Sequence, residues 1–328
     1  MRNNSGQFAY GIPKIGAFDG YGKYHRVKIA SLSKTALLHA LNNGGLAIKI
    51  GGFHVCLATP IPDLADHLSK LYGQFEIIDK SVEFVDFYTS LIPTPGLRRF
   101  FRPQVNFSFD GYFPFKPIPY NQASALFEWG LNWCVASHSQ QFLIIHSAVV
   151  ERNGQAVIFP GTPGSGKSTL SAALVCKGWR LLSDEMALLS LADGLVYPMP
   201  RPISLKNRSI DVIRQFHAEA VFGKVVNDTL KGTVGHLRPP DSSVSLATTP
   251  AQPAVVVFPK YEAQSATVLQ PLSKGRALIK LAENSFNYNI LGVHGFQALA
   301  RLIDASACYD FKYSCLDEAI ALFTELTD

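Results

Sequence analysis

The residues at 161–169, GTPGSGKST, have the types and the spacing that bind the phosphates of a nucleotide. They satisfy the Walker A pattern G-x-x-x-x-G-K-[ST] of a P-loop, in which glycines let backbone N–H groups converge on phosphate oxygens. Lys167 is placed to reach the β- and γ-phosphates, and the Ser168 hydroxyl to hold Mg²⁺. A helix expected directly after the loop adds its N-terminal dipole. We therefore predict that ATP and Mg²⁺ bind at Gly161, Thr162, Pro163, Gly164, Ser165, Gly166, Lys167, Ser168 and Thr169.

The apolar run before the loop, LIIHSAVV at 143–150, contains a histidine, His146. Asn153-Gly154 then predicts a two-residue β-hairpin, because both turn residues take positive φ. Counting back along that hairpin places His146 opposite Gly161, with Cα atoms about 4.5–5.5 Å apart. Alone, His146 would suit a core position, but this register predicts that it lies at the phosphates and takes part in the chemistry. An antiparallel strand directly before the loop also predicts a mixed sheet.

Two adjacent acids, Asp184 and Glu185, interrupt the apolar run at 179–191, which we predict to be one strand. Burying both is costly unless they meet a cation, and the nucleotide's Mg²⁺ is the obvious one; an exposed strand end is the alternative. Neighbouring strand residues point to opposite faces, so we expect different roles. Because Asp184 has the shorter carboxylate, we predict that it accepts the proton of an attacking hydroxyl. Ser168 and Asp184 are the predicted metal ligands, and Glu185 a supporting group.

Two domains are predicted to position these residues. Residues 1–119 form an N-terminal α+β domain, and the proline-rich stretch at 114–122 links it to an α/β nucleotide-binding domain at 120–328. In the first domain we expect helices at 31–43 and 61–75, and strands within 44–59, 84–92 and 104–111. In the second we expect helices at 123–138, 167–177 and 209–217, strands at 143–152, 155–160, 179–191 and 254–261, a polar loop around 224–248, and two C-terminal helices.

The composition is that of an ordinary globular enzyme, with 328 residues, 47% hydrophobic and 17% charged, and a net charge of +5. No run of like charges suggests nucleic-acid binding. Five cysteines without C-x-x-C spacing indicate reduced thiols and a cytoplasmic location. We expect neither a signal peptide at 1–14 nor a transmembrane helix. Basic residues in loop-like stretches are candidates for a phosphate or substrate clamp, although surface solvation would explain each equally well: Arg201, Lys206, Lys231 and Arg238.

The three elements His146, GTPGSGKST and LLSDE, in this order and spacing, resemble the HPr kinase/phosphorylase family of bacterial P-loop protein kinases. The resemblance is greater to the group called HPr kinase-related kinase A, and there it extends through FEWGLNW, RPISLKNRSI, KGTVGHLRPP, VVVFPKY and SFNYNILGVHGF. It implies a core fold similar to that of phosphoenolpyruvate carboxykinases, ATP and Mg²⁺ as cofactors, phosphorylation of a serine hydroxyl, and a homo-oligomer.

By the same resemblance, His146 matches a strand histidine beside the phosphates, and the acid pair matches two aspartates of the family. The chain departs in having Glu185 second and in lacking the family's Gly-rich second signature, so HPr itself and reverse phosphorolysis are not implied. We predict an ATP-dependent kinase acting on a hydroxyl of a protein or a small molecule. Two alternatives stay open: a nucleotide-binding regulatory protein, and a carboxykinase-like small-molecule phosphotransferase.

Overall fold

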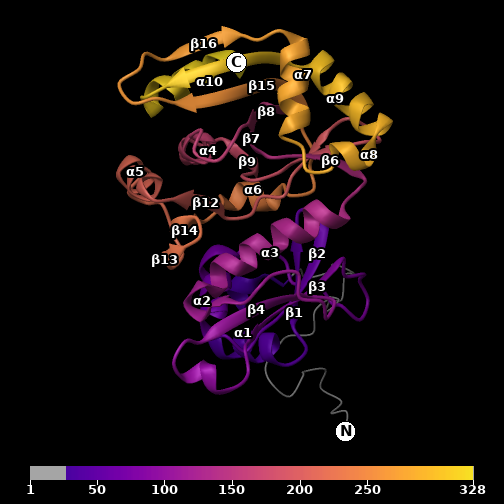
Figure 1. Cartoon of the computed structure of the whole chain (residues 1–328), viewed down its shortest axis with the longest axis vertical. Helices are drawn as coiled ribbons and strands as arrows, with labels where there is room; N and C mark the ends of the chain where they lie inside the picture. The colour runs from indigo at the N-terminus through magenta and orange to yellow at the C-terminus, as the bar shows by residue number, and fades with distance from the viewer. Residues whose placement is uncertain (1–26, 328) are drawn as a thin grey trace, which may run out of the picture. The chain divides into compact units, whose positions relative to one another are not determined.

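The structure is a computed structural model that describes residues 27–327, and the chain divides into two compact units. One unit holds the described residues up to Leu131 together with Phe222–Thr233; the other holds Asn132–Val221 and the residues from Val234 onward (Figure 1). The sequence placed a single boundary near residue 119, whereas this division falls inside the helix at Ala123–His138. The signal-peptide prediction concerns residues 1–14, which lie outside the described residues.

The described helices and strands follow one another in this order: η1 (Ile29–Ser31), α1 (Lys34–Asn42), β1 (Leu46–Ile50), β2 (Phe53–Ala58), α2 (Pro62–Leu71), β3 (Phe87–Pro93), η2 (Leu97–Phe100), β4 (Gln104–Phe109), β5 (Ile118–Pro119), η3 (Tyr120–Gln122), α3 (Ala123–His138), β6 (Phe142–Ile145), β7 (Ser147–Arg152), β8 (Gln155–Pro160), α4 (Lys167–Cys176), β9 (Arg180–Ser183), β10 (Ala187–Ser190), β11 (Val196–Tyr197), β12 (Ile203–Lys206), α5 (Arg208–Phe216), β13 (Val226–Thr229), β14 (Gly232–Leu237), α6 (Asp241–Ser245), β15 (Gln252–Tyr261), β16 (Val268–Pro271), α7 (Lys274–Glu283), α8 (Tyr288–Leu291), α9 (Val293–Ala305), β17 (Ala307–Tyr313) and α10 (Leu316–Thr327).

The first unit is built on a five-stranded sheet with the order β1-β2-β3-β4-β5. Strands β1 and β2 are antiparallel across a tight turn, and β2 and β3 are parallel because α2 lies between them in the chain. Ser33 caps α1 by accepting the N–H of Ala36, and Pro62 occupies the first turn of α2. Leucines on one stripe of each helix are buried, so the predicted helices and strands of this part are confirmed.

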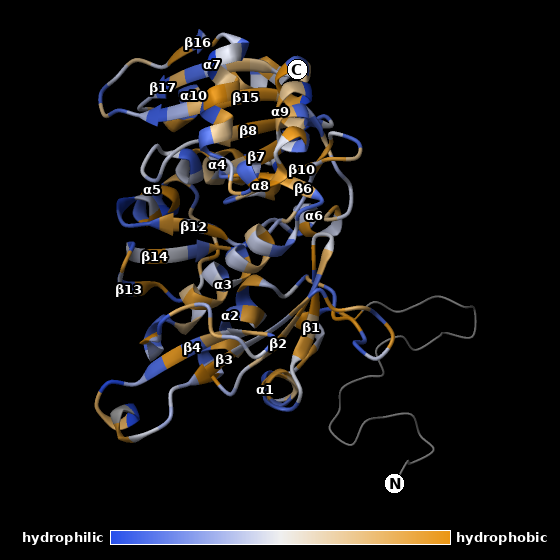
Figure 2. Cartoon of the chain, turned by 45° about the vertical axis from the view of Figure 1, so that its right-hand side comes forward, coloured by the Kyte–Doolittle hydropathy of each residue, from blue (hydrophilic) through white to orange (hydrophobic). Residues whose placement is uncertain are grey.

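The second unit contains a six-stranded mixed sheet with the order β16-β17-β15-β8-β7-β9. Strand β15 is parallel to both β8 and β17, and β7 is antiparallel to both β8 and β9, which confirms a mixed α/β sheet. Figure 2 shows β7, β8 and β15 as largely hydrophobic, as strands covered on both faces should be. On one face Ile158 packs in a cluster with Leu299 and Leu302 of α9. On the other, Phe159 meets Phe323 of α10 edge to face.

Two strands predicted to be continuous are each broken in the structure, and this corrects the sequence analysis. The run at 143–152 stops at His146, so that β6 and β7 belong to different sheets. The run at 179–191 likewise stops after Ser183 and resumes at Ala187, with β9 in the six-stranded sheet and β10 paired with β6. The two breaks lie next to each other in the fold: the Ser147 N–H donates a hydrogen bond to the Glu185 carbonyl at 3.3 Å. The polar side chains of both runs therefore lie where the chain passes from one sheet to the other.

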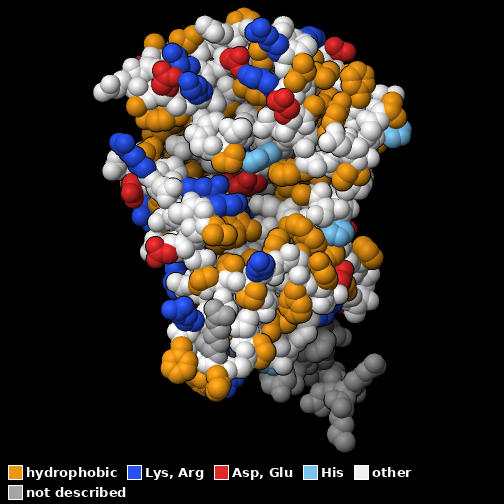
Figure 3. Space-filling model, in the orientation of Figure 1, with side chains coloured by type: hydrophobic (Ala, Val, Ile, Leu, Met, Phe, Trp, Pro, Cys, Tyr) orange, Lys and Arg blue, Asp and Glu red, His pale blue; other side chains and the backbone are white. Residues whose placement is uncertain are grey.

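The remaining corrections concern the last third of the chain. The predicted polar loop around 224–248 contains β13, β14 and α6, and β14 pairs antiparallel with β12. Four helices and two strands follow β15, where the sequence predicted two helices. Among residues 27–327, no helix has both the length and the apolarity needed to cross a membrane. Lys, Arg, Asp and Glu side chains are dispersed over the face seen in Figure 3, without one large basic field.

Candidate active site

The predicted P-loop, called the P-loop below, connects the end of β8 to the start of α4. Gly166 takes φ +95° directly before the helix, and α4 has no side-chain cap, so its first N–H groups are left for another acceptor. The Tyr313 hydroxyl donates to the Gly166 carbonyl at 3.0 Å and fixes the turn. The buried Lys167 ammonium bonds back to the Gly161 carbonyl at 3.2 Å. The Lys167 ammonium, at the start of α4, thus lies next to Gly161 at the other end of the loop, and a helix N-terminus with a lysine beside it suits an anion.

The predicted hairpin is present in the predicted register. Arg152 pairs with Gln155, and the ladder ends at Ser147 opposite Pro160, so His146 and Gly161 are the next positions on the two strands. His146 itself leaves the ladder, because its N–H donates to the Asn284 carbonyl at 2.7 Å. Its ring stacks on Phe286 with centroids 5.5 Å apart. The histidine therefore lies beside the start of the P-loop.

Asp184 lies on the inner side of the strand break, against α4. It is 5% exposed; its Oδ2 accepts the Ser204 N–H at 2.8 Å and its Oδ1 lies 3.4 Å from the Ser171 hydroxyl. Burial, with the charge of Glu185, raises the pKa of Asp184 to about 6, against the lowering effects of the Ser204 bond, the charge of Lys167 and a bond from Ser168. Because burial disfavours the charged form of Asp184, a cation beside it would compensate that charge. A carboxylate next to the Ser168 hydroxyl suits a hard cation such as Mg²⁺.

Ser168 and Asp184 are the side chains that could hold Mg²⁺ here. Magnesium in nucleotide sites is usually bound by one or two protein oxygens, with the phosphates and water completing the shell. Residues 27–327 contain no group of three or more His, Cys, Asp or Glu side chains that could hold a metal ion. The Ser204 hydroxyl is buried near these oxygens and has no hydrogen-bond partner among residues 27–327. The residues therefore fit a magnesium ion shared with a nucleotide.

Glu185 points the other way, toward His146 and Lys206. Its Oε2 lies 3.4 Å from His146 Nε2, and its Oε1 lies 3.9 Å from Lys206 Nζ. Burial alone would raise the pKa of Glu185, but the His146 hydrogen bond and the Lys206 and Lys167 charges outweigh it and lower the pKa to about 2. The side chain is 20% exposed, so this carboxylate is charged and open to an incoming group. The two acids have separate environments, but they lie in the break between β9 and β10, so the difference does not come from the alternation of strand side chains on which the prediction was based.

Of the four predicted clamp residues, one belongs to this site. Lys206 contacts Glu185, as described above. Arg201 is buried and donates to the Asn132 side chain at 2.9 Å. Lys231 lies over the Trp129 ring in the first unit, and Arg238 faces Asp241 at 3.9 Å.

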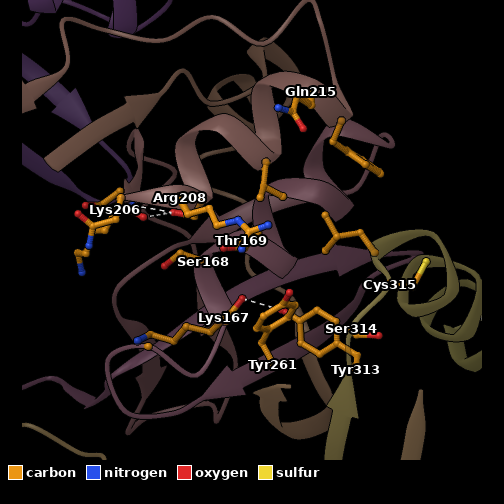
Figure 4. A pocket seen from close by; sticks show the side chains of 18 of the residues that line it. Lys167, Ser168, Thr169, Lys206, Arg208, Gln215, Tyr261, Tyr313, Ser314 and Cys315 are labelled. Atoms are coloured by element: carbon orange, nitrogen blue, oxygen red, sulfur yellow. Dashed lines mark hydrogen bonds between the residues drawn. The ribbon is translucent and has the colours of Figure 1, made fainter. Parts of the chain in front are cut away.

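Residues that were not predicted from the sequence also lie at this site. Ser171 is one helical turn from Ser168 on the same face of α4, a spacing that could have been noticed. Ser204 and Arg208 come from β12 and the start of α5, and no local pattern connects them to the P-loop. They line a cavity of about 780 Å³ together with Lys167, Ser168 and Thr169 (Figure 4).

No family model matches the chain, and no curated protein matches its sequence. Among solved structures, the chain is similar to "Structure of the Hpr(Ser) kinase/phosphatase from Coxiella burnetii". The two are 12% identical, the match covers 56% of this chain and 96% of that chain, and the TM-score is 0.25. A likeness of this size leaves the function to be argued from the residues of the site, and the resemblance to HPr kinase-related kinase A stays a prediction.

Proposed function

We propose that this protein is a kinase that binds ATP with Mg²⁺ at 161–169 and transfers the γ-phosphoryl group to a serine-type hydroxyl of a protein or small molecule. One observation supports it above the others: two neighbouring carboxylates at a strand break beside a P-loop have opposite surroundings. Asp184 is buried against P-loop helix hydroxyls, while Glu185 is charged, partly exposed and paired with His146. A phosphoryl transferase needs one group on the metal side and one on the acceptor side.

On the donor side, the Lys167 ammonium and the N–H groups of the first turn of α4 would bind the phosphates. Ser168 and Asp184 would hold Mg²⁺, which when bound neutralises charge on the phosphate oxygens. The Ser204 N–H fixes the Asp184 carboxylate, and the Ser171 hydroxyl stands beside it, so that its orientation is set before any ligand arrives. This half of the site positions the donor and contributes no covalent step.

On the acceptor side, we assign the proton-accepting role to Glu185, where the sequence had suggested Asp184. The acceptor oxygen bonds to the γ-phosphorus, the bond from that phosphorus to the bridging oxygen breaks, ADP leaves, and the hydroxyl proton passes to the Glu185 carboxylate. Such transition states are loose in most analyses, so the hydroxyl carries little charge until late and the carboxylate mainly orients it. A lowered pKa is compatible with that task, and His146 holds the carboxylate in place.

The test is incubation of the full chain with γ-labelled ATP, Mg²⁺ and cell lysate, followed by separation of protein and small-molecule fractions. We expect label in one of these fractions, and we expect Glu185→Gln to remove it while Glu325→Gln, an exposed change at the far end of α10, does not. Label found only as released phosphate would overturn the kinase proposal in favour of a nucleotide-hydrolysing regulator. Unchanged transfer by Glu185→Gln would instead remove Glu185 from the proton-accepting role.

A further inference from the structure

A group of strongly exposed apolar side chains lies in the loop that joins β3 to β4. This loop, residues 94–103, has the sequence TPGLRRFFRP and is called the β3–β4 tip below. Leu97, Phe100 and Phe101 are 80%, 67% and 86% exposed there. Single exposed apolar residues are ordinary on a protein surface, but a contiguous patch marks a surface that binds a protein or a membrane.

The β3–β4 tip is a closed turn that protrudes from the first unit. The Thr94 N–H donates to the Gln104 carbonyl at 2.9 Å and closes the neck of the loop. The Arg99 N–H donates to the Gly96 carbonyl at 3.3 Å within η2. Figure 2 shows this turn at the lower left, beyond the ends of β3 and β4, and Figure 3 shows hydrophobic side chains at the same end of the first unit. The apolar side chains are therefore presented on a convex surface and not in a groove.

The charged residues of the β3–β4 tip are all basic. The hairpin at 87–109 contains Arg98, Arg99 and Arg102 and no acidic residue. The Arg99 guanidinium lies 4.7 Å over the Phe100 ring. An arginine can lay its aliphatic stem along apolar surface while its charged head stays in a polar layer. The tip thus offers an apolar end with positive charge directly beside it.

A second group of exposed apolar residues, at the other end of β3, has the opposite charge beside it. Val82 and Phe84 are 81% and 80% exposed, and Glu83 and Asp86 are their neighbours in the chain. An anionic surface would repel this group and attract the β3–β4 tip. Because the two groups are similar in exposure, the second is a matched control for the first.

We infer that the β3–β4 tip binds the surface of a membrane that contains anionic lipids. Phe100 and Phe101 enter the boundary between headgroups and acyl chains, and Arg99 and Arg102 stay at the level of the lipid phosphates. A bilayer closes around a convex turn from every side, whereas a protein partner would need a complementary surface of about 800 Å². Apolar burial and charge attraction act together here, and peripheral binding commonly needs two such contributions. This site belongs to the first unit and does not depend on the reaction proposed for the second.

Co-sedimentation of the full chain with vesicles measures both contributions. Vesicles made of equal parts phosphatidylcholine and phosphatidylglycerol should pellet the protein, and vesicles of phosphatidylcholine alone should not. Phe101→Ser should weaken binding by about tenfold or more, because it removes a ring that the interface buries. Arg102→Gln should weaken it by about fivefold, as expected for one basic residue near an anionic surface. Phe84→Ser, the matched control, should bind as the parent chain does.

Salt dependence and fluorescence give two further readouts. Raising the salt from about 0.1 M to about 1 M shortens the screening length from about 10 Å to about 3 Å and should weaken binding of the parent chain. Phe101→Trp should bind at least as well as the parent, since Trp is favoured at membrane interfaces. Lipids brominated in the acyl chains should quench the added Trp at 101 and not the one in Phe84→Trp, and both variants share the three native tryptophans as background.

The substituted side chains are exposed, so each variant should keep the circular dichroism spectrum of the parent chain. Equal pelleting with the two kinds of vesicle, or unchanged binding by both Phe101→Ser and Arg102→Gln, would overturn the membrane site. Failure of the parent chain to pellet with anionic vesicles would also overturn it. If a photo-crosslinking group at position 101 then captured a protein from a lysate, the β3–β4 tip would be a docking site for a protein partner instead.

Discussion

The adjacent acids Asp184 and Glu185 should change the stability of the metal-free protein in opposite directions when each is neutralised. Asp184→Asn keeps the side-chain shape, and its amide can still accept the Ser204 N–H and donate to the Ser171 hydroxyl. The substitution removes a negative charge whose burial destabilises the folded protein. Glu185→Gln instead removes a negative charge that contacts with His146 and Lys206 stabilise in the folded protein.

The magnitude follows from the pKa of each carboxyl. That of Asp184 rises from 3.8 to about 6, and each pKa unit corresponds to about 1.4 kcal/mol, so its ionisation opposes folding by about 3 kcal/mol above pH 6. This opposition is absent below about pH 4, and the free energy of unfolding falls as pH rises through that interval. The pKa of Glu185 falls from 4.5 to about 2, which stabilises the fold above pH 4.5 by a similar amount and is lost toward pH 2.

Scanning calorimetry at pH 7.5 without Mg²⁺ or nucleotide measures both effects on the thermal unfolding transition of the second unit. For a unit of this size, about 1 kcal/mol moves the midpoint by about 2–4 °C, so Asp184→Asn should raise it by several degrees and Glu185→Gln should lower it. The gain should be largely lost when the comparison is repeated near pH 4, where Asp184 is neutral in the folded protein and about half neutral in the unfolded chain. Shifts of the same sign in the two variants would refute the assignment of opposite environments.

Three further predictions follow from the P-loop and from the first unit. Lys167→Ala should abolish tight binding of ATP with Mg²⁺ in calorimetric titration with an unchanged circular dichroism spectrum; unchanged affinity would remove the phosphate role. Gly166→Ala places a Cβ at φ +95° and 2.6 Å from the Tyr313 hydroxyl, so it should weaken ATP binding at least tenfold, whereas a near-normal affinity would show that the turn relaxes. Gly130→Ala drives a Cβ into the Phe107 ring, which should cost about 1–3 kcal/mol in urea unfolding and leave ATP binding unchanged.

Features that depend on neighbouring residues could be predicted from the sequence. Asn153 and Gly154 adopt φ of 54° and 81°, as the two-residue turn requires, and that turn fixes the register of the whole β7–β8 hairpin. Gly178, at φ 93°, follows Lys177, the C-cap of α4, at the position where a left-handed residue commonly ends a helix. In both cases one or two residues determine the backbone conformation, so the local sequence is sufficient to predict it.

The strand breaks could not be predicted in this way, because they depend on pairing between distant segments. His146 and the acid pair each interrupt a run that is apolar on both sides of them. The sequence around them therefore gives no sign that the strand ends. The runs change sheets because β6 pairs with β10 while β7 pairs with β8 and β9, and no local residue encodes those partners. For the same reason Ser204 could not be connected with Asp184, since β12 delivers it from a distant part of the chain. That a polar residue in an apolar run marks a functional position stays a prediction. Its chemistry depends on the break itself, which turns Glu185 toward His146 and leaves Asp184 against α4.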